Sequence, residues 1–249
     1  MSIVVENVSF PSEGVSLLGR LYLPAPEGRY PSVVICHGYP GDMKNTDLAE
    51  ELALNGIVTL IFYYQGAWGS KGTYRFTKLE PSTRDAVAYL RSQPCVDPER
   101  VGLVSHSMGA LPLVKRLSLD PTIKSAALMS PVSDIGLWTT GDAIETIIPH
   151  FIESAKGKLE GLTATQLRVD LRELTEAGNP IDLIGAVKAP TLLVVGSEDD
   201  ITPPDLCKLL YEKAREPKRW VLIDRADHGY SEHRIPLMRA VLDWLRTTL

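Results

Sequence analysis

The chain has 249 residues, of which 44% are apolar and 23% are charged, a size and composition that suit one α/β domain with a full core. Its formal net charge of −5 provides no basic surface for a polyanion, so no nucleic-acid partner is expected and a small neutral or apolar substrate fits better. The sequence has no apolar run long enough to span a bilayer and no basic leader with a cleavage site, so neither a membrane span nor secretion is expected.

The cysteine content favours a reducing environment. Cys36, Cys95 and Cys207 are odd in number and widely spaced, and no two of them form a Cys-x-x-Cys pair. This pattern predicts neither a disulfide framework nor a zinc site. We therefore expect a cytoplasmic protein.

The predicted elements alternate as in a parallel sheet that is covered on both faces. Residues 2–10 and 15–23 predict two strands joined by the turn at Pro11-Ser12-Glu13-Gly14, and thus an antiparallel edge hairpin. After Pro24, short apolar runs alternate with segments of helical spacing. The predicted strands are 32–36, 57–63, 101–104, 125–129, 191–195 and 220–223, and the predicted helices are 47–55, 83–92, 108–119, 204–215 and 236–249.

Residues 131–189 interrupt this alternation because they are far too many for an ordinary strand-to-helix connection. A helical stripe runs through 142–155, with Pro149 expected to kink it, and Leu167, Leu171 and Leu174 form a second stripe that stops at Gly178. Two or three amphipathic helices therefore form a predicted cap over one end of the sheet. The alternative is that they add core layers without any contact to substrate.

A strand, a sharp turn and a helix meet at Ser107. The strand is 101–104 and the helix opens at Met108, so the turn would expose the Ser107 hydroxyl. Such a hydroxyl needs exposure, a base and donors for the developing oxyanion in order to act as a nucleophile. Gly109 meets the demand for a small residue across the turn. The simpler alternative is that Ser107 only caps the following helix.

Ser105 departs from the usual pattern, since it stands where glycine is common. Serine is small enough for that position. Ser105 is itself a weaker nucleophile candidate, because it lies before the turn and has Leu103 and Ser107 as its own flanking residues.

The acid is expected after the strand at 191–195. Asp199 is preferred to Asp200, because the spacing Gly196-x-x-Asp199-x-x-x-Pro203 resembles the acid turn of α/β hydrolases. Either aspartate could instead satisfy loop amides. Asp134, which follows an earlier strand, is a weaker alternative.

The base is expected in the loop after 220–223, where His228 can lie over the turn. Its imidazole would take the proton of Ser107 and later give it to the leaving group, while Asp199 holds the ring in the useful tautomer. Three other histidines are less suited by their positions beside the nucleophile, in the cap and before the last helix: His106, His150 and His233.

The strand 32–36 ends in a His37-Gly38-Tyr39 segment that is similar to the oxyanion loop of the same superfamily. Gly38 lets the backbone approach the substrate closely. By this resemblance the oxyanion donors are the backbone amides of Tyr39 and Met108. His37 is expected to bond the loop backbone rather than to take part in catalysis.

Taken in chain order, these motifs resemble the α/β-hydrolase superfamily from about residue 30 to the C-terminus. The loop 63–72 is similar to one found in compact esterases related to dienelactone hydrolases, in cinnamoyl or feruloyl esterases and in prolyl oligopeptidase-like peptidases. Dienelactone hydrolases carry cysteine at the nucleophile, and large prolyl peptidases add a propeller that this chain does not encode. The resemblance implies an α/β-hydrolase fold over 1–249, with a mostly parallel sheet, helices on both faces and a helical cap insertion at about 131–189.

The activity implied is hydrolysis of small to medium carboxylic esters, aromatic ones included, through an acyl-serine intermediate. Water activated by His228 would complete the reaction, and neither a metal nor an organic cofactor is needed. Trp68, Trp138 and Tyr230 are candidates for the substrate pocket, together with Tyr39 and Met108, although any of them could be core.

Other activities stay open at this stage. A peptidase or amidase of the prolyl oligopeptidase-like type, a thioesterase and a lysophospholipase would need the same triad. A non-enzymatic binding protein on this fold would be expected to have a broken triad, whereas this one is complete. A homodimer is compatible with the sequence, which does not define the oligomeric state.

Overall fold

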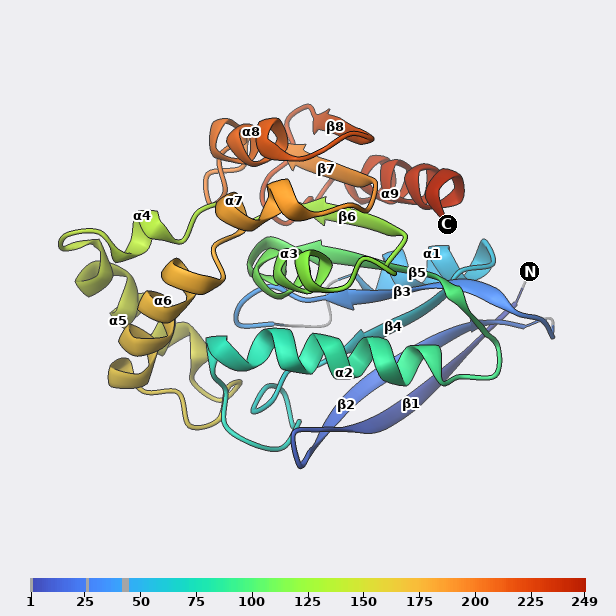
Figure 1. The fold of residues 1–249 in the computed structure, drawn as a ribbon, viewed down its shortest axis with the longest axis horizontal. Coiled ribbons are helices and arrows are strands. Elements are labelled where there is room, and N and C mark those ends of the chain that lie inside the picture. The colour runs from blue at the N-terminus through green and yellow to red at the C-terminus, as the bar shows by residue number, and fades with distance from the viewer. Residues whose placement is uncertain (1, 26, 42–44) are drawn as a thin grey trace.

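The computed structural model describes residues 2–25, 27–41 and 45–249, which form an eight-stranded sheet of order β1-β2-β4-β3-β5-β6-β7-β8 (Figure 1). The β1–β2 and β2–β4 pairs are antiparallel, and the other pairs are parallel. This arrangement confirms the predicted fold class. The strands are β1 Ile3–Ser12, β2 Val15–Pro24, β3 Tyr30–Cys36, β4 Val58–Phe62, β5 Val96–His106, β6 Ser125–Met129, β7 Thr191–Gly196 and β8 Lys218–Ile223.

The edge hairpin forms as predicted, with a tight turn at Glu13 and Gly14. Both residues have positive φ, 44° and 83°, which is the backbone that a two-residue hairpin turn requires. Strand β5 differs from its prediction, since it begins at Val96 rather than at residue 101. Val96 pairs with Tyr30, but Asp97 to Arg100 are polar and carry no apolar pattern that could reveal the pairing.

Helices cover both faces of the sheet. Helices α1 (Thr46–Leu54) and α9 (Arg234–Thr248) pack on one face, and α2 (Leu79–Arg91), α3 (Ala110–Leu119) and α8 (Pro204–Lys213) pack on the other (Figure 1). None of the helices in the described part of the chain is long and apolar enough to cross a bilayer.

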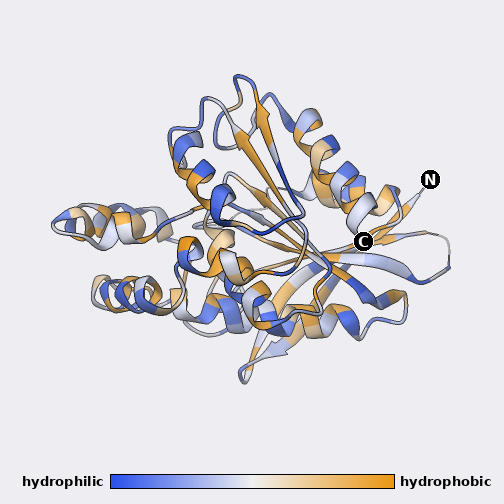
Figure 2. Ribbon diagram, turned by 45° about the horizontal axis from the view of Figure 1, so that its top comes forward, coloured by the Kyte–Doolittle hydropathy of each residue, from blue (hydrophilic) through white to orange (hydrophobic). Residues whose placement is uncertain are grey.

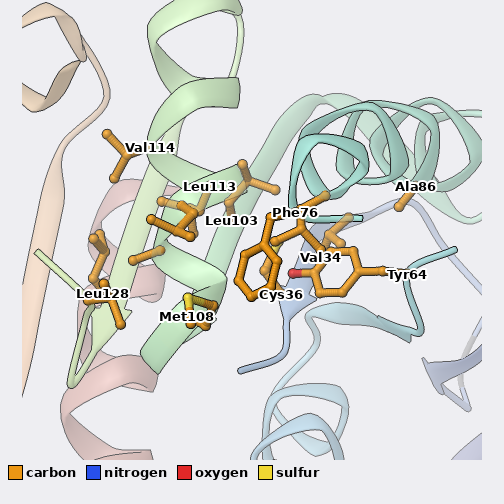
Figure 3. Packing of buried hydrophobic residues seen from close by; sticks show 14 of the residues in the cluster. Val34, Cys36, Tyr64, Phe76, Ala86, Leu103, Met108, Leu113, Val114 and Leu128 are labelled. Carbon is orange, nitrogen blue, oxygen red and sulfur yellow. The ribbon is translucent and has the colours of Figure 1, made fainter. Parts of the chain in front are cut away.

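The continuous apolar run of β3 contributes side chains to two separate core clusters. Successive side chains of a strand point to opposite faces. Val34 and Cys36 therefore join the cluster beneath α2 and α3, and Val33 and Ile35 join the one beneath α1 and α9. Figure 3 shows part of the first cluster, and Figure 2 shows that the central strands are the most apolar part of the fold. Burial on both faces explains why the strand sequence lacks polar alternation.

The segment between β6 and β7 is helical. It contains α4 (Gly136–Thr139), α5 (Ala143–Ala155), α6 (Ala164–Ala177) and α7 (Pro180–Leu183), and α4 to α6 lie at one end of the sheet (Figure 1). We call residues 131–189 the cap. The two amphipathic stripes correspond to α5 and α6, and α5 continues through Pro149. The four-residue helices α4 and α7 are too short for periodicity to reveal.

A buried ion pair fastens the cap to the body of the domain. The Asp170 side chain on α6 is fully buried, and it accepts hydrogen bonds from Arg75 Nε at 2.9 and 3.0 Å and from the Phe76 amide at 2.8 Å. The terminal guanidinium nitrogen of Arg75 donates a further hydrogen bond to the Asp170 carboxylate. These donors compensate the cost of removing the carboxylate from water.

Replacing Asp170 with asparagine should lower the free energy of unfolding by about 2 kcal/mol, because the Arg75 guanidinium loses its charged partner in a half-buried site. Urea unfolding of the purified variant measures this change. The matched control is Glu145→Gln, which removes the solvent-exposed ion pair that joins α5 to Arg168 on α6. An equal loss in both variants would contradict the special role of the buried pair.

Candidate active site

Ser107 lies at a strained turn between β5 and α3. Its φ of 55° falls in the left-handed region, which costs a non-glycine residue about 1–3 kcal/mol. The turn also packs tightly on the end of β3. A Cβ on Gly109 would lie 2.2 Å from the carbonyl oxygen of Cys36, so that position requires glycine. The sharp turn leaves Ser107 partly exposed at the carboxyl edge of the sheet.

Ser105 lies on the strand itself and is fully buried. Its hydroxyl has no hydrogen-bond partner among the described residues. The structure therefore gives this serine no route to a substrate. Its small volume accounts for its place next to the turn.

The acid turn and the histidine loop meet through two hydrogen bonds. His228 Nδ1 lies 3.0 Å from each carboxylate oxygen of Asp199. The carboxylate also accepts bonds from the amides of Ile201, at 3.0 Å, and Thr202, at 2.8 Å, and from the Thr202 hydroxyl at 2.9 Å. Asp199 thus orders its own loop and orients the imidazole at the same time.

The carboxylate of Asp199 is held in its charged form. Burial raises its pKa, but hydrogen bonds from His228, Ser130 and Thr202 outweigh burial and lower the pKa to about 2. An ionised Asp199 can stabilise a protonated imidazole next to it.

The two other candidate carboxylates lie elsewhere. Asp200 is exposed and points to the cavity described below. Asp134 accepts bonds from the Gly136 amide at 2.8 Å and from Asn179 Nδ2 at 2.7 Å, so it shapes the start of the cap. Of the three aspartates considered from the sequence, Asp199 is the one that contacts His228.

The remaining histidines have structural or peripheral positions. His106 Nε2 lies 2.9 Å from the carbonyl oxygen of His228 and so supports the histidine loop rather than the Ser107 hydroxyl. His37 Nδ1 lies 2.7 Å from the Gly38 carbonyl oxygen, in keeping with a role in loop structure. His233 immediately precedes α9, and His150 is exposed on α5.

The loop after β3 runs against the turn at Ser107. A Cβ on Gly38 would lie 3.1 Å from Ser107 Cβ, which places the backbone leading into Tyr39 beside the hydroxyl. The Tyr39 hydroxyl donates to the Phe151 carbonyl on α5 at 2.6 Å, and its ring packs on those of Phe76 and Phe151. The loop is therefore fixed to the cap.

Trp68 holds the same loop from another side. Its indole nitrogen donates to the Pro40 carbonyl at 3.0 Å, while its backbone amide donates to the Lys158 carbonyl in the cap at 2.9 Å. Trp68 thus links the cap to the loop through hydrogen bonds. It does not line the cavity beside Ser107 that is described next. The sequence led us to expect Trp68 in a substrate pocket, and the contacts described here are to the loop and the cap.

A cavity of about 330 Å³ opens between Ser107 and the cap. Of the pocket residues expected from the sequence, Trp138, Tyr39 and Met108 line it, and Met108 also belongs to the core cluster in Figure 3. The full lining consists of Tyr39, Pro40, Ser107, Met108, Val132, Trp138, Ile147, His150, Phe151, Ser154, Asp200 and Ile201.

Tyr230, which was expected from the sequence to line a substrate pocket, is not among the residues that line this cavity. It is completely buried, and its hydroxyl bonds to Ser130 Oγ at 2.9 Å and to the Val194 carbonyl at 2.8 Å. A tyrosine two residues after a loop histidine gives no sign in the sequence of which way its ring turns.

His150 and Ser154 also line the cavity, although neither was expected there from the sequence. Together with Ile147 and Phe151 they follow helical spacing along one face of α5. The signal was therefore present in the cap helix, but the polar members of that face were not assigned to a cavity.

The sheet order, the turn at Ser107 and the acid and histidine loops after β7 and β8 define the chain as an α/β hydrolase. It belongs to the family described as "Serine aminopeptidase, S33", whose sequence profile matches residues 29–232.

The chain is also similar in sequence to a curated relative, and it shares its fold with solved structures. The Uncharacterized protein Rv2307c of Mycobacterium tuberculosis is 28% identical over 249 residues, which cover 99% of this chain and 78% of the relative. The α/β hydrolase GrgF from Penicillium sp. sh18 superposes with a TM-score of 0.78 at 17% identity, covering 98% of this chain and 99% of GrgF. Est1E from Butyrivibrio proteoclasticus, solved with ferulic acid bound, has a TM-score of 0.76 at 20% identity, covering 97% and 98% of the two chains.

The low pKa of Asp199 predicts a specific dependence of stability on pH. An unfolded aspartate titrates near ~3.9, so the contribution of Asp199 is complete above that pH and is lost as the pH falls toward about 2. The difference in unfolding free energy between wild type and Asp199→Asn should therefore shrink between about pH 4 and pH 2. Urea unfolding at stepped pH measures it. Asp200→Asn removes the exposed neighbouring carboxylate, and its unfolding free energy should change with pH as that of wild type does. A difference between wild type and Asp199→Asn that stays constant over this pH range would refute the assignment.

Proposed function

We propose that the chain is a serine hydrolase that cleaves carboxylic esters through an acyl-serine intermediate, with Ser107, Asp199 and His228 as its triad. The observation that carries this proposal is the pairing of His228 with Asp199 at 3.0 Å beside a serine held at positive φ. Ser107 and His228 line one small cavity of about 100 Å³. A reacting carbonyl there would lie within reach of both groups.

In the proposed reaction, His228 takes the proton of Ser107 as the hydroxyl oxygen attacks the ester carbonyl carbon. The oxyanion is stabilised by the backbone amides of Tyr39 and Met108, and losing one such donor typically costs about 3 kcal/mol of transition-state stabilisation. The bond to the alcohol oxygen then breaks as His228 protonates that oxygen. Water, activated by the same imidazole, releases the acid and restores Ser107.

The cavity beside Ser107 supports ester substrates of small to medium size. Its wall is mainly apolar and aromatic, and its volume of about 330 Å³ lies in the range of small-molecule sites. Est1E, which shares the fold, has been solved with ferulic acid, an aromatic carboxylic acid. The proposal includes a cytoplasmic location, with which the three free thiols Cys36, Cys95 and Cys207 are consistent.

An aminopeptidase activity is the second candidate, because the family description names one and Asp200 lines the cavity. A carboxylate there could pair with the free amino group of an aminoacyl substrate. Rates on an aminoacyl anilide and on a neutral acyl ester distinguish the two candidates. A preference for the anilide that disappears in Asp200→Asn would favour the peptidase.

A fluorophosphonate probe tests the nucleophile directly. Ser107→Ala should abolish covalent labelling and lower ester kcat by at least about 10³-fold, because no hydroxyl remains to attack. Ser105→Ala is the matched control two residues away, and it should label like wild type because its buried hydroxyl bonds to nothing in the described chain. Labelling of Ser107→Ala at the wild-type rate would overturn the proposal.

Tyr39→Phe tests whether the cap holds the oxyanion loop in place. The change keeps the ring contacts but removes the hydrogen bond to Phe151, so kcat should fall about fivefold with KM little changed. Steady-state kinetics measure kcat and KM separately, and urea unfolding checks that the fold is intact. A rise in KM at constant kcat would instead assign the hydroxyl to substrate binding.

A further inference from the structure

Ser107 lies between two cavities that differ in size and chemistry. The cavity of about 330 Å³ extends beneath the cap, and the one of about 100 Å³ extends toward the histidine loop. They share Tyr39, Pro40 and Ser107 as a common wall. A substrate bound at the hydroxyl therefore has two distinct spaces for the two halves of its ester bond.

From this arrangement we infer that the larger cavity holds the acyl group and the smaller one holds the alcohol, so that the preferred substrates are esters of medium-length neutral acids with small alcohols. This inference rests on the proposed ester hydrolase function. It adds an orientation of the substrate, which the triad alone does not define.

The position of the base decides which half enters which cavity. His228 must protonate the departing alcohol oxygen as the carbon–oxygen bond breaks. His228 lines the smaller cavity together with Gly38, Gly41 and His106, and it does not line the larger one. The alcohol therefore departs on the side of the smaller cavity.

The position of the oxyanion donors agrees with this orientation. Met108, whose amide is one proposed donor, lines the larger cavity and not the smaller one. With the carbonyl oxygen directed at the amides of Tyr39 and Met108 and the alcohol toward His228, the remaining substituent of the carbonyl carbon points under the cap. That substituent is the acyl chain.

The volumes set the sizes of the two halves. The larger cavity has about three times the volume of the smaller one, so the longer half of the substrate matches the larger cavity. An ethanol leaving group therefore suits the smaller cavity, and an octanoyl chain suits the larger one.

The lining of the larger cavity determines the chemistry of the acyl chain. Met108, Val132, Trp138, Ile147, Phe151 and Ile201 supply apolar surface, and Asp200 contributes a carboxylate. No lysine or arginine is among the described residues that line it. His150 and Ser154 add polar groups, but most of the lining is apolar, and a neutral apolar acyl chain therefore suits this cavity.

Two isomeric esters test the orientation. Ethyl octanoate and octyl acetate contain the same atoms and differ only in which side of the ester bond is long. Wild-type enzyme should show a kcat/KM for ethyl octanoate at least tenfold above that for octyl acetate. Equal rates, or a preference for octyl acetate, would overturn the inference.

The fluorophosphonate probe separates this inference from the proposed function. If Ser107 is labelled but neither ester is cleaved, the orientation proposed here is wrong while a reactive serine stands. If Ser107 is not labelled either, the proposed function fails and the orientation fails with it.

A variant that fills the larger cavity tests which half occupies it. Ile147→Trp places bulk on the cavity face of α5, and the ratio of kcat/KM for ethyl octanoate over ethyl acetate should fall at least tenfold. Glu153→Trp on the exposed face of the same helix is the matched control and should keep the wild-type ratio. A selective loss of octyl acetate hydrolysis in Ile147→Trp would assign the cavity to the alcohol and refute the inference.

Discussion

The close packing of the turn at Ser107 against the end of β3 is the constraint on which the rest of the site depends. A Cβ on Gly109 would collide with the Cys36 carbonyl, and a Cβ on Gly38 would crowd Ser107, so glycine at both positions allows the two backbone segments to approach closely. This approach directs the serine hydroxyl away from the core. In the proposed reaction, the amides that follow Gly38 and Ser107 are the donors to the oxyanion.

The cap then determines how rigidly that arrangement is held. It bonds to the loop after β3 directly through Phe151 and Tyr39, and indirectly through Trp68, which links Lys158 to Pro40. The Arg75–Asp170 pair fixes α6 to the body of the domain. Because the same segment lines the larger cavity, a change in cap position would alter substrate fit and loop geometry together.

The sequence predicted the sheet, its covering helices and the meeting of Asp199 with His228, because each of these depends on local patterns. Apolar runs identify buried strands, and loops at the carboxyl ends of neighbouring parallel strands lie side by side. The orientations of the Trp68 and Tyr230 side chains were not predictable in this way. Both are large aromatic residues near the motifs, but the direction of each ring depends on distant partners such as Pro40 and Val194.

Substrate preference likewise depends on contacts between residues that are far apart in the sequence. The proposed triad needs a serine, an imidazole and a carboxylate at one edge of the sheet, and the parallel strands β5, β7 and β8 bring their following loops to that edge. The larger cavity lies where α5 and the loop after β3 meet beside Ser107, a contact between residues 112 positions apart in the sequence, as in the bond from Tyr39 to Phe151. Substitutions on the inner face of α5 can therefore change the acyl group accepted while the hydrogen bonds between His228 and Asp199 stay in place, because no residue of that helix contributes to them.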